Sequence, residues 1–406
     1  MWRSLESSIM IVAAVAVTAS ACSDYSLAPV RPSNARIASD VVAPSSIGWQ
    51  EQARALAAGA NMSPLAASRV YAALGVAQYR AVLEIDGVDT DGVLPEHGLG
   101  AGGRSALDAR RGAVAGASAT VLGFLFPSAA SDMEARVEVE GNAGPGNVNP
   151  HFTRGLGIGR VAGAAMVDRL KADRFTTPWT GTVPTGAGRW IANGPPAGAT
   201  FGGVTPYFMT SGAQFRSAPP PAFGSAAFNT DLAEVATMAA NRTEAQRTSA
   251  LYWNLPTGTH TPVGYWTSVA GDYITSRGMD DRAATHVFAL TNAAMMDALI
   301  GCWEAKYHYW TLRPSQANGQ ISLTFALPNH PSYPSGHSCV SAAAATVLAD
   351  FFPERTTELA SWVTESGLSR MYAGIHYRFD ITAGRELGNS VARWAIDHEA
   401  ALRVAP

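Results

Sequence analysis

Three short motifs near the C-terminal end of the chain carry most of the residues that could do chemistry. They cover 306–314 (KYHYWTLRP), 334–337 (PSGH) and 369–380 (SRMYAGIHYRFD). Their cations include Lys306, Arg313 and Arg370, but their single carboxylate is that of Asp380. Arginine presents a fixed fork of N–H donors that matches the oxygens of a tetrahedral oxyanion. The set therefore predicts a site for a multiply charged, phosphate-like anion.

The PSGH motif adds neutral donors to this site. Ser335 offers a hydroxyl group, and Gly336 lets a backbone N–H approach a ligand closely because it has no Cβ atom. The following segment, 338–350 (SCVSAAAATVLAD), is rich in alanine and has spaced apolar residues, which predicts a helix. Gly336 and His337 would then lie at a helix N-terminus, where free N–H groups and the helix dipole attract an anion.

The two histidines of the motifs have different expected roles. His376 and Asp380 are four residues apart in a segment with helical periodicity, so Asp380 can accept a hydrogen bond from the imidazole. That bond fixes the tautomer and raises the basicity of the other ring nitrogen. His376 is therefore the candidate nucleophile or metal-oxo ligand. His337, beside the predicted anion site, is the candidate general acid/base.

The triple motif resembles the superfamily that joins vanadium-dependent haloperoxidases to type 2 phosphatidic acid phosphatases and bacterial acid phosphatases. The resemblance implies that vanadate or phosphate binds here, and that its oxygens accept hydrogen bonds from Lys306, Arg313, Ser335, Gly336 and Arg370. It also implies that His376 bonds vanadium or attacks phosphorus, that His337 is the acid/base, and that Asp380 holds His376. Segments 188–196 (GRWIANGPP), 204–216 (VTPYFMTSGAQFR), 219–225 (PPPAFGS) and 253–270 (WNLPTGTHTPVGYWTSVA) are also similar to bacterial haloperoxidase-like proteins.

The anion site alone serves two chemistries, because vanadate has the geometry of a phosphoryl-transfer transition state. A haloperoxidase would use hydrogen peroxide to oxidise a halide, which then reacts with a small organic substrate. A secreted acid phosphatase, the alternative, would hydrolyse phosphomonoesters through a phosphohistidine at His376. The long region ahead of the motifs favours the haloperoxidase, since the acid phosphatases of this group are compact. A non-catalytic lipoprotein of the same fold fits less well, because both histidines are present.

Two further residues bear on the choice of halide. His330, in HPSYPSGH (330–337), resembles the bromoperoxidase version of the motif, in which His stands where chloroperoxidases have Phe. Trp303, three residues before Lys306, resembles the chloroperoxidase arrangement. We expect both residues in the halide pocket, and bromide over chloride as the substrate.

The N-terminal residues have the pattern of an export signal. Arg3 precedes an apolar run, and small residues lead to Cys22, as in bacterial lipoprotein signals. We expect export to the bacterial periplasm or cell envelope with a lipid anchor at Cys22, and a plain secretory signal is the alternative. Segment 23–48 then reads as a Pro/Ser/Ala linker.

The composition of the chain fits an exported enzyme. Of its 406 residues 47% are apolar and 15% charged, with a net charge of −3 and no basic run, so no nucleic-acid partner is expected. After the signal (1–22) and linker we expect an N-terminal helical region (49–225) and a helical core with the motifs (226–406).

The elements that position the motifs are predicted to be helices. Apolar residues recur at helical spacing over 64–83, 105–126, 155–170, 230–241, 281–308, 356–372 and 379–394. Asp281 is the expected cap of the longest one. The Pro/Gly-rich segment 178–225 should cover a surface or line the entrance to the site. The predicted fold is all-α, with packed helical bundles and long connecting loops, as the resemblance to vanadium haloperoxidases also implies.

Two cysteines flank the motifs. Cys302 precedes Lys306 by four residues, and Cys339 follows His337 by two. In an oxidising compartment they could form a disulfide. We favour two buried thiols that behave as small hydrophobic side chains.

Overall fold

The computed structural model describes residues 44–87, 104–142 and 149–403. In these ranges the chain forms thirteen α-helices, and its only strand-like pairing is an isolated bridge between Arg189 and Thr311. The all-α prediction is confirmed. The export signal and most of the linker lie outside the described residues, and the described end of the linker differs from expectation because helix α1 already begins at Ser45.

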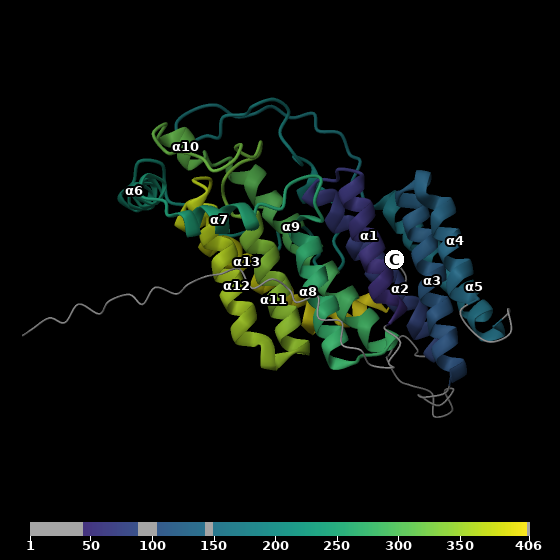
Figure 1. The fold of residues 1–406 in the computed structure, drawn as a ribbon. Coiled ribbons are helices and arrows are strands. Elements are labelled where there is room, and N and C mark those ends of the chain that lie inside the picture. Colours follow the sequence, from purple (N-terminus) through teal and green to yellow (C-terminus); the bar gives the residue numbers. More distant parts are fainter. Residues whose placement is uncertain (1–43, 88–103, 143–148, 404–406) are drawn as a thin grey trace, which may run out of the picture.

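Five helices form the N-terminal part. They are α1 (Ser45–Gly59), α2 (Pro64–Asp86), α3 (Arg104–Leu125), α4 (Ala130–Gly141) and α5 (Pro150–Ala172). Helices α3, α4 and α5 lie together at one side of the molecule (Figure 1). Helices α3 and α5 pack backbone to backbone, since a Cβ atom on Gly155 or Gly159 would overlap the carbonyl groups of Ala109 or Ala113.

The remaining described helices form the C-terminal part, in which α9 is the longest. They are α6 (Ala226–Ala240), α7 (Glu244–Tyr252), α8 (Thr261–Arg277), α9 (Asp281–Tyr309), α10 (Pro314–Ala317), α11 (Gly336–Phe351), α12 (Thr356–Tyr372) and α13 (Arg378–Asp397). Helix α9 packs against α2, α8, α11 and α13. It is long and apolar enough to cross a membrane, but 89% of its most apolar stretch is buried inside the protein, as expected of a central core helix.

The start of α9 corrects the predicted cap. Asp280 is the N-cap, and its side chain accepts a hydrogen bond from the N–H of Ala283 at 3.1 Å. Asp281 is the first helical residue. Its buried carboxylate accepts hydrogen bonds from the N–H groups of Ser45 and Ser46 at 3.1 and 2.9 Å. Asp281 therefore ties the start of α1 to α9.

A long irregular segment connects α5 to α6 over the end of the core that carries the motifs (Figure 1). Its N–H groups find partners in the loops beyond α9: Trp190 donates to the carbonyl of Trp310 at 2.8 Å, and Ala197 donates to that of Asn329 at 2.9 Å. Ala197, Gly198, Thr200 and Phe201 line a cavity there. The expectation that the Pro/Gly-rich segment lines a site entrance agrees with this placement.

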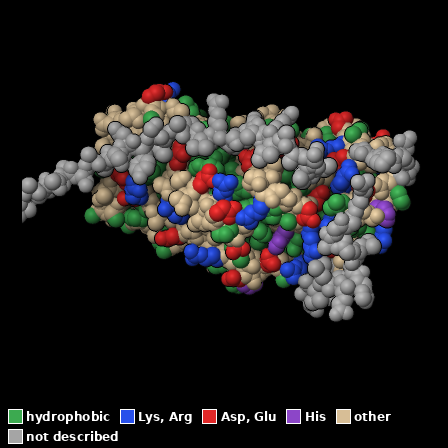
Figure 2. All heavy atoms as spheres, turned by 60° about the horizontal axis from the view of Figure 1, so that its bottom comes forward, with side chains coloured by type: hydrophobic (Ala, Val, Ile, Leu, Met, Phe, Trp, Pro, Cys, Tyr) green, Lys and Arg blue, Asp and Glu red, His purple; other side chains and the backbone are tan. Residues whose placement is uncertain are grey.

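Most of the buried apolar side chains form one large cluster, beside three smaller ones. It runs from Trp49 in α1 to Leu402 near the C-terminal end, so it includes residues on both sides of position 225. The surface carries charges of both signs: Figure 2 shows Lys and Arg interspersed with Asp and Glu on one face of the molecule.

Candidate active site

The three motifs meet at one end of the core helices. The first ends α9, the second begins α11, and the third joins α12 to α13. Close contact between α11 and α13 brings the last two together: a Cβ atom on Gly384 would lie 2.6 Å from the carbonyl oxygen of Ser335 and 2.9 Å from the Cβ of Ser338. In addition, the N–H of Ser335 donates to the carbonyl of Asp380 at 3.0 Å.

His376 and Asp380 form the expected pair, but not on one helix. Helix α13 begins at Arg378, with Tyr377 as its N-cap, so His376 lies just before the helix. The Asp380 Oδ2 atom accepts hydrogen bonds from His376 Nδ1 at 2.7 Å, from Ser332 Oγ at 2.5 Å and from the Tyr377 N–H at 3.2 Å. The predicted helical spacing is wrong here, because the carboxylate in the first turn of α13 folds back toward the residues that precede the helix.

The partners of His376 fix its tautomer. Arg313 Nη1 lies 3.1 Å from His376 Nε2, and a guanidinium group can only donate. Nε2 therefore accepts and Nδ1 carries the proton that is shared with Asp380. Burial, followed by the charges of Arg313 and Lys306, holds the pKa of His376 well below 6.5. His376 is a neutral imidazole with a lone pair at Nε2.

The three cations are fully buried, and none lies within ion-pair distance of a carboxylate in the described residues. Burial lowers the pKa of Lys306 to about 8, that of Arg313 to about 10 and that of Arg370 to about 9. Buried charges are costly unless they are paired. This excess of positive charge favours an anion at the site.

Lys306 and Arg313 donate mainly to loop carbonyls. Lys306 Nζ donates to the carbonyls of Pro331 at 3.0 Å and Ser332 at 2.8 Å, and also to that of Pro334. Arg313 donates to the carbonyls of His330 and Ile375 at 3.1 and 2.8 Å. Both cations thereby hold the loops that carry the histidines.

Arg370 is the cation with an unused donor. Its Nε donates to Ser369 Oγ at 2.9 Å and its Nη2 to the carbonyl of Ala250 at 2.8 Å. Its Nη1 is buried and has no hydrogen-bond partner among the described residues. Arg370 also lines the cavity. A buried donor without a partner is rare and points to a missing acceptor.

The PSGH motif begins α11 as predicted. Ser335 is the N-cap, and its Oγ accepts from the N–H of Ser338 at 3.4 Å. A Cβ atom on Gly336 would lie 3.1 Å from the Trp303 ring, so glycine fits this tight position. His337 Nε2 donates to the carbonyl of Trp253 at 2.7 Å, which leaves Nδ1 for proton transfer. Burial and then Arg370 hold the pKa of His337 well below 6.5.

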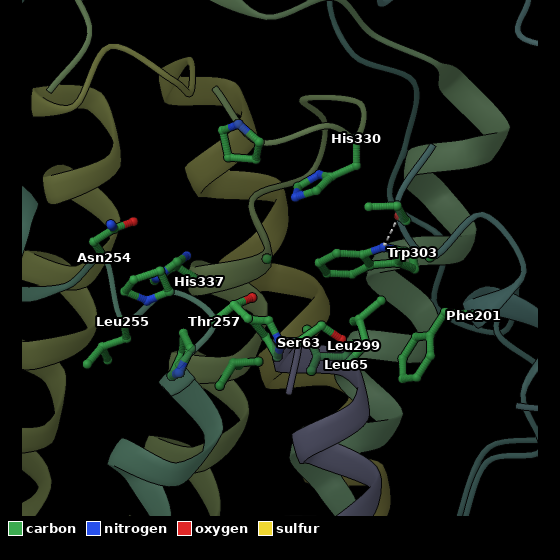
Figure 3. A pocket seen from close by; sticks show the side chains of 18 of the residues that line it. Ser63, Leu65, Phe201, Asn254, Leu255, Thr257, Leu299, Trp303, His330 and His337 are labelled. Atoms are coloured by element: carbon green, nitrogen blue, oxygen red, sulfur yellow. Dashed lines mark hydrogen bonds between the residues drawn. The ribbon is translucent and has the colours of Figure 1, made fainter. Parts of the chain in front are cut away.

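A cavity of about 680 Å³ borders this group of residues. Figure 3 shows His337, His330 and Trp303 around it, with Leu299 and Phe201 further from the histidines. His376, Arg370 and Gly336 also line it, whereas Lys306, Arg313 and Ser335 are buried behind its wall. The structure thus brings all the predicted site residues together, some at the wall and others in support of it.

The two predicted halide-pocket residues are neighbours in this wall. The rings of His330 and Trp303 lie 5.0 Å apart. His330 Nδ1 lies 3.0 Å from Arg313 Nη2 and 3.2 Å from the Pro331 carbonyl oxygen, so a donor and an acceptor both contact this nitrogen. Trp303 Nε1 donates to the carbonyl of Ala197 at 3.2 Å.

Several residues of the site were not predicted. Ser332, which donates to Asp380, lies in the HPSYPSGH segment, where its position between His330 and Ser335 was an available signal. The Trp253 carbonyl has no signal in the sequence, because any residue supplies a carbonyl group. Cys302 and Cys339 are both buried and free, in agreement with the favoured thiol interpretation.

Comparison with known proteins finds a family match for the part of the chain that carries the motifs. Residues 283–400 match the PAP2 superfamily. This segment contains all three motifs, so the resemblance found in the sequence is confirmed. A non-specific acid phosphatase of Salmonella typhimurium is 38% identical over 82 residues, which are 20% of this chain and 30% of that protein. The chain thus spans about a third of that relative's length.

Solved structures share the fold over most of the chain. A bacterial vanadium-dependent iodoperoxidase matches with a TM-score of 0.72 at 21% identity, covering 87% of this chain and 95% of that one. A bacterial vanadium-dependent chloroperoxidase in its holo form matches with a TM-score of 0.64 at 14% identity, covering 84% of this chain and 94% of that one. The arrangement of helices is therefore that of bacterial vanadium haloperoxidases.

Proposed function

We propose that the protein is a vanadium-dependent haloperoxidase, which oxidises halide with hydrogen peroxide. The observation that carries the proposal is the group of three buried cations around the neutral imidazole of His376, none of which pairs with a carboxylate in the part of the chain that the structure describes. The likeness to the iodoperoxidase supports oxidation over hydrolysis, since it extends through the long N-terminal part.

The residues present fit vanadate. Arg370 has an unpartnered donor, the N-terminus of α11 faces the same place, and His376 has its Nε2 lone pair on the side of Arg313. His376 would bond vanadium, and Lys306, Arg313, Ser335, Gly336 and Arg370 would bind its oxygens. Arg313 would exchange its hydrogen bonds to His376 and His330 for bonds to the anion. When bound, vanadate supplies a Lewis-acid centre for the reaction of hydrogen peroxide with halide.

The protein residues handle the protons of this reaction. Hydrogen peroxide, a halide ion and one proton give hypohalous acid and water. His337, neutral and with Nδ1 unbonded in the described structure, can take a proton from peroxide and return one to the departing oxygen. Asp380 keeps the His376 proton on Nδ1 throughout.

Three more specific proposals are based on the amino-acid sequence. We propose bromide as the preferred halide, because His330 borders the cavity beside Trp303. A small organic molecule would accept the halogen. We also propose export to the bacterial periplasm or cell envelope with a lipid anchor at Cys22, on the signal-like N-terminal residues.

A secreted acid phosphatase is the second candidate, favoured by the identity to the Salmonella enzyme. His376 Nε2 would attack phosphorus and break the bond to the leaving oxygen, which His337 would protonate. Water would then hydrolyse the phosphohistidine and release phosphate. The cradle would hold phosphate in place of vanadate.

One experiment separates the two candidates. The purified protein is loaded with vanadate and tested for bromination of a phenol dye with hydrogen peroxide, and the vanadate-free protein is tested for hydrolysis of an aryl phosphate. We expect bromination that is lost in His376→Ala and kept in Asp350→Asn, an exposed change at the end of α11. Aryl phosphate turnover that depends on His376, without bromination by the loaded protein, would refute the haloperoxidase proposal.

A further inference from the structure

The cavity is larger than the anion site needs. Beyond the histidines it extends between the start of α2, the segment around Phe201, the α7–α8 loop and the side of α9 (Figure 3). Its volume of about 680 Å³ lies within the range of about 300–1,000 Å³ that is typical of pockets for organic ligands. We call this region, away from the cations, the organic chamber.

The walls of the organic chamber are mainly apolar. Its lining includes Leu65, Phe175, Phe201, Leu299 and Val340, with the polar Ser63, Thr200 and Thr257 among them. No Asp, Glu or Lys is among the described residues that line the cavity, and Arg370, at the anion end, is the one Arg among them. Such walls favour an uncharged ligand and offer no counter-ion to an organic cation.

The organic chamber has a closed end and an open end. Phe201, Leu299 and Trp303 are less than a tenth exposed, and they form the closed end. Pro256 and Thr257 in the α7–α8 loop are exposed, with Leu255 half-buried beside them. This loop forms the rim of the cavity together with the exposed residues Ser63, Ala197 and Ala326. A ligand that enters past the loop would place its apolar body against the aromatic side chains.

We propose that the organic chamber binds an uncharged, apolar, ring-containing organic molecule beside the anion site. The consequence of this binding rests on the proposed function. Hypohalous acid would transfer halogen to the bound molecule, so that a C–H bond and hypohalous acid give a C–halogen bond and water. In a phosphatase the same chamber would take the apolar alcohol part of the ester. Binding of the organic molecule in the chamber requires neither the haloperoxidase nor the phosphatase reaction.

The chamber is tested by calorimetric titration with 2-naphthol, without vanadate or peroxide. Leu255→Trp would place an indole at the opening, and we expect affinity to fall by about tenfold or more. Leu251 lies on the surface of α7 and is 47% exposed. The Leu251→Trp variant should therefore bind 2-naphthol like the unchanged protein. If Leu255→Trp melts at a lower temperature, Thr257→Trp at the exposed rim replaces it.

The outcomes distinguish this inference from the proposed function. Failure of the unchanged protein to bind 2-naphthol, or equal binding by both tryptophan variants, overturns the chamber, whatever the bromination assay shows. Binding that Leu255→Trp weakens supports the chamber even in a protein that does not brominate. A cationic naphthylmethylammonium probe should bind more weakly than 2-naphthol, and tighter binding of the cation would contradict the uncharged ligand class.

Discussion

Lys306 and Arg370 are charged groups whose protonation depends on what occupies the site. Burial lowers the pKa of Lys306 to about 8 and that of Arg370 to about 9. A bound anion stabilises the protonated forms, so anion binding and proton binding are coupled. His376 stays neutral over the same range because its pKa is held well below 6.5.

We therefore predict that anion affinity falls as pH rises. Below about pH 8 Lys306 is already protonated in the free protein, so anion binding requires no proton uptake. Above about pH 8 Lys306 must take up a proton when the anion binds, and each proton taken up lowers the anion affinity by about tenfold per pH unit. Titration with sulfate, whose charge is constant from about pH 6 to about pH 10, measures this directly. The Lys306→Met variant should bind weakly at all pH values and lose the change near pH 8. An unchanged pH profile in that variant would assign the effect to another group.

Asp380 should act as a positioning residue for His376. In Asp380→Asn the amide can donate toward the imidazole, which moves the ring proton to Nε2 and opposes both Arg313 and a bound vanadium. We expect vanadate affinity to fall by about 10- to 100-fold, as for other partners of metal-bound histidines. Nitrogen-15 NMR of the imidazole should report the tautomer change. A normal tautomer with normal vanadate affinity would exclude this role, and Asp350→Asn is the control.

At the residue level the sequence predicted which residues form the site better than it predicted the contacts that hold them there. The pairing of His376 with Asp380 is confirmed, but it arises at the start of α13 and not from helical spacing. Lys306 and Arg313 were predicted by type and order. Their contacts to the carbonyls of His330, Pro331 and Ile375 could not be predicted, because those carbonyls are placed by loop conformation and not by side-chain chemistry.

At the scale of elements, the contact between α11 and α13 determines the geometry of the site. Gly384 and Gly388 lie against the backbone of α11, near Ser335 and Cys339. This contact brings the N-terminus of α11, the proposed anion site, close to His376 just before α13.

Gly384→Ala should therefore damage both stability and binding. The added methyl group would lie 2.6 Å from the Ser335 carbonyl oxygen, so the helices must move apart. We expect a loss of about 1–3 kcal/mol in unfolding free energy, together with weaker sulfate binding. Gly157→Ala, on a face of α5 with no atom within 4 Å of the new Cβ, should be neutral or stabilising in denaturant unfolding. Equal stability of the two variants would show that α13 can shift without cost.

The helices that were predicted are on the whole the longer ones, and α2, α3, α5, α9 and α13 have at least 20 residues each. The bounds of α12 agree with the prediction at both ends, and α2, α3, α9 and α13 are within a few residues. The missed helices have other patterns. Helix α8 is buried on most sides, so its apolar residues show no stripe, while α4 buries only Met133 and Val137. Helices α1 and α7 were also missed, and α7 has only nine residues.

At the scale of the whole molecule, the N-terminal helices complete the core of the C-terminal ones. Helix α2 packs along α9, where a Cβ atom on Gly75 would lie 3.0 Å from the carbonyl oxygen of Phe288. The position after residue 225, taken from the sequence as a boundary, falls within one continuous cluster of buried side chains.

We predict that residues 226–406 do not fold alone. Without α2 the buried face of α9 would be exposed to water, and apolar surface of that extent promotes aggregation. The isolated fragment should show no cooperative thermal transition by circular dichroism, whereas the full chain should show one. A cooperative transition in the fragment, with retained sulfate binding, would show that the motif-bearing helices are an independent unit.

Two kinds of element, core helices and loops, contribute residues to the site. Helices α9, α11, α12 and α13 carry the residues of the proposed anion site, while the segment around Phe201 and the α7–α8 loop supply walls of the organic chamber. Loops tolerate sequence change more readily than core helices. Under the proposed function, natural selection could thus exchange one organic substrate for another by altering loops alone, and leave the oxyanion chemistry of the helices intact.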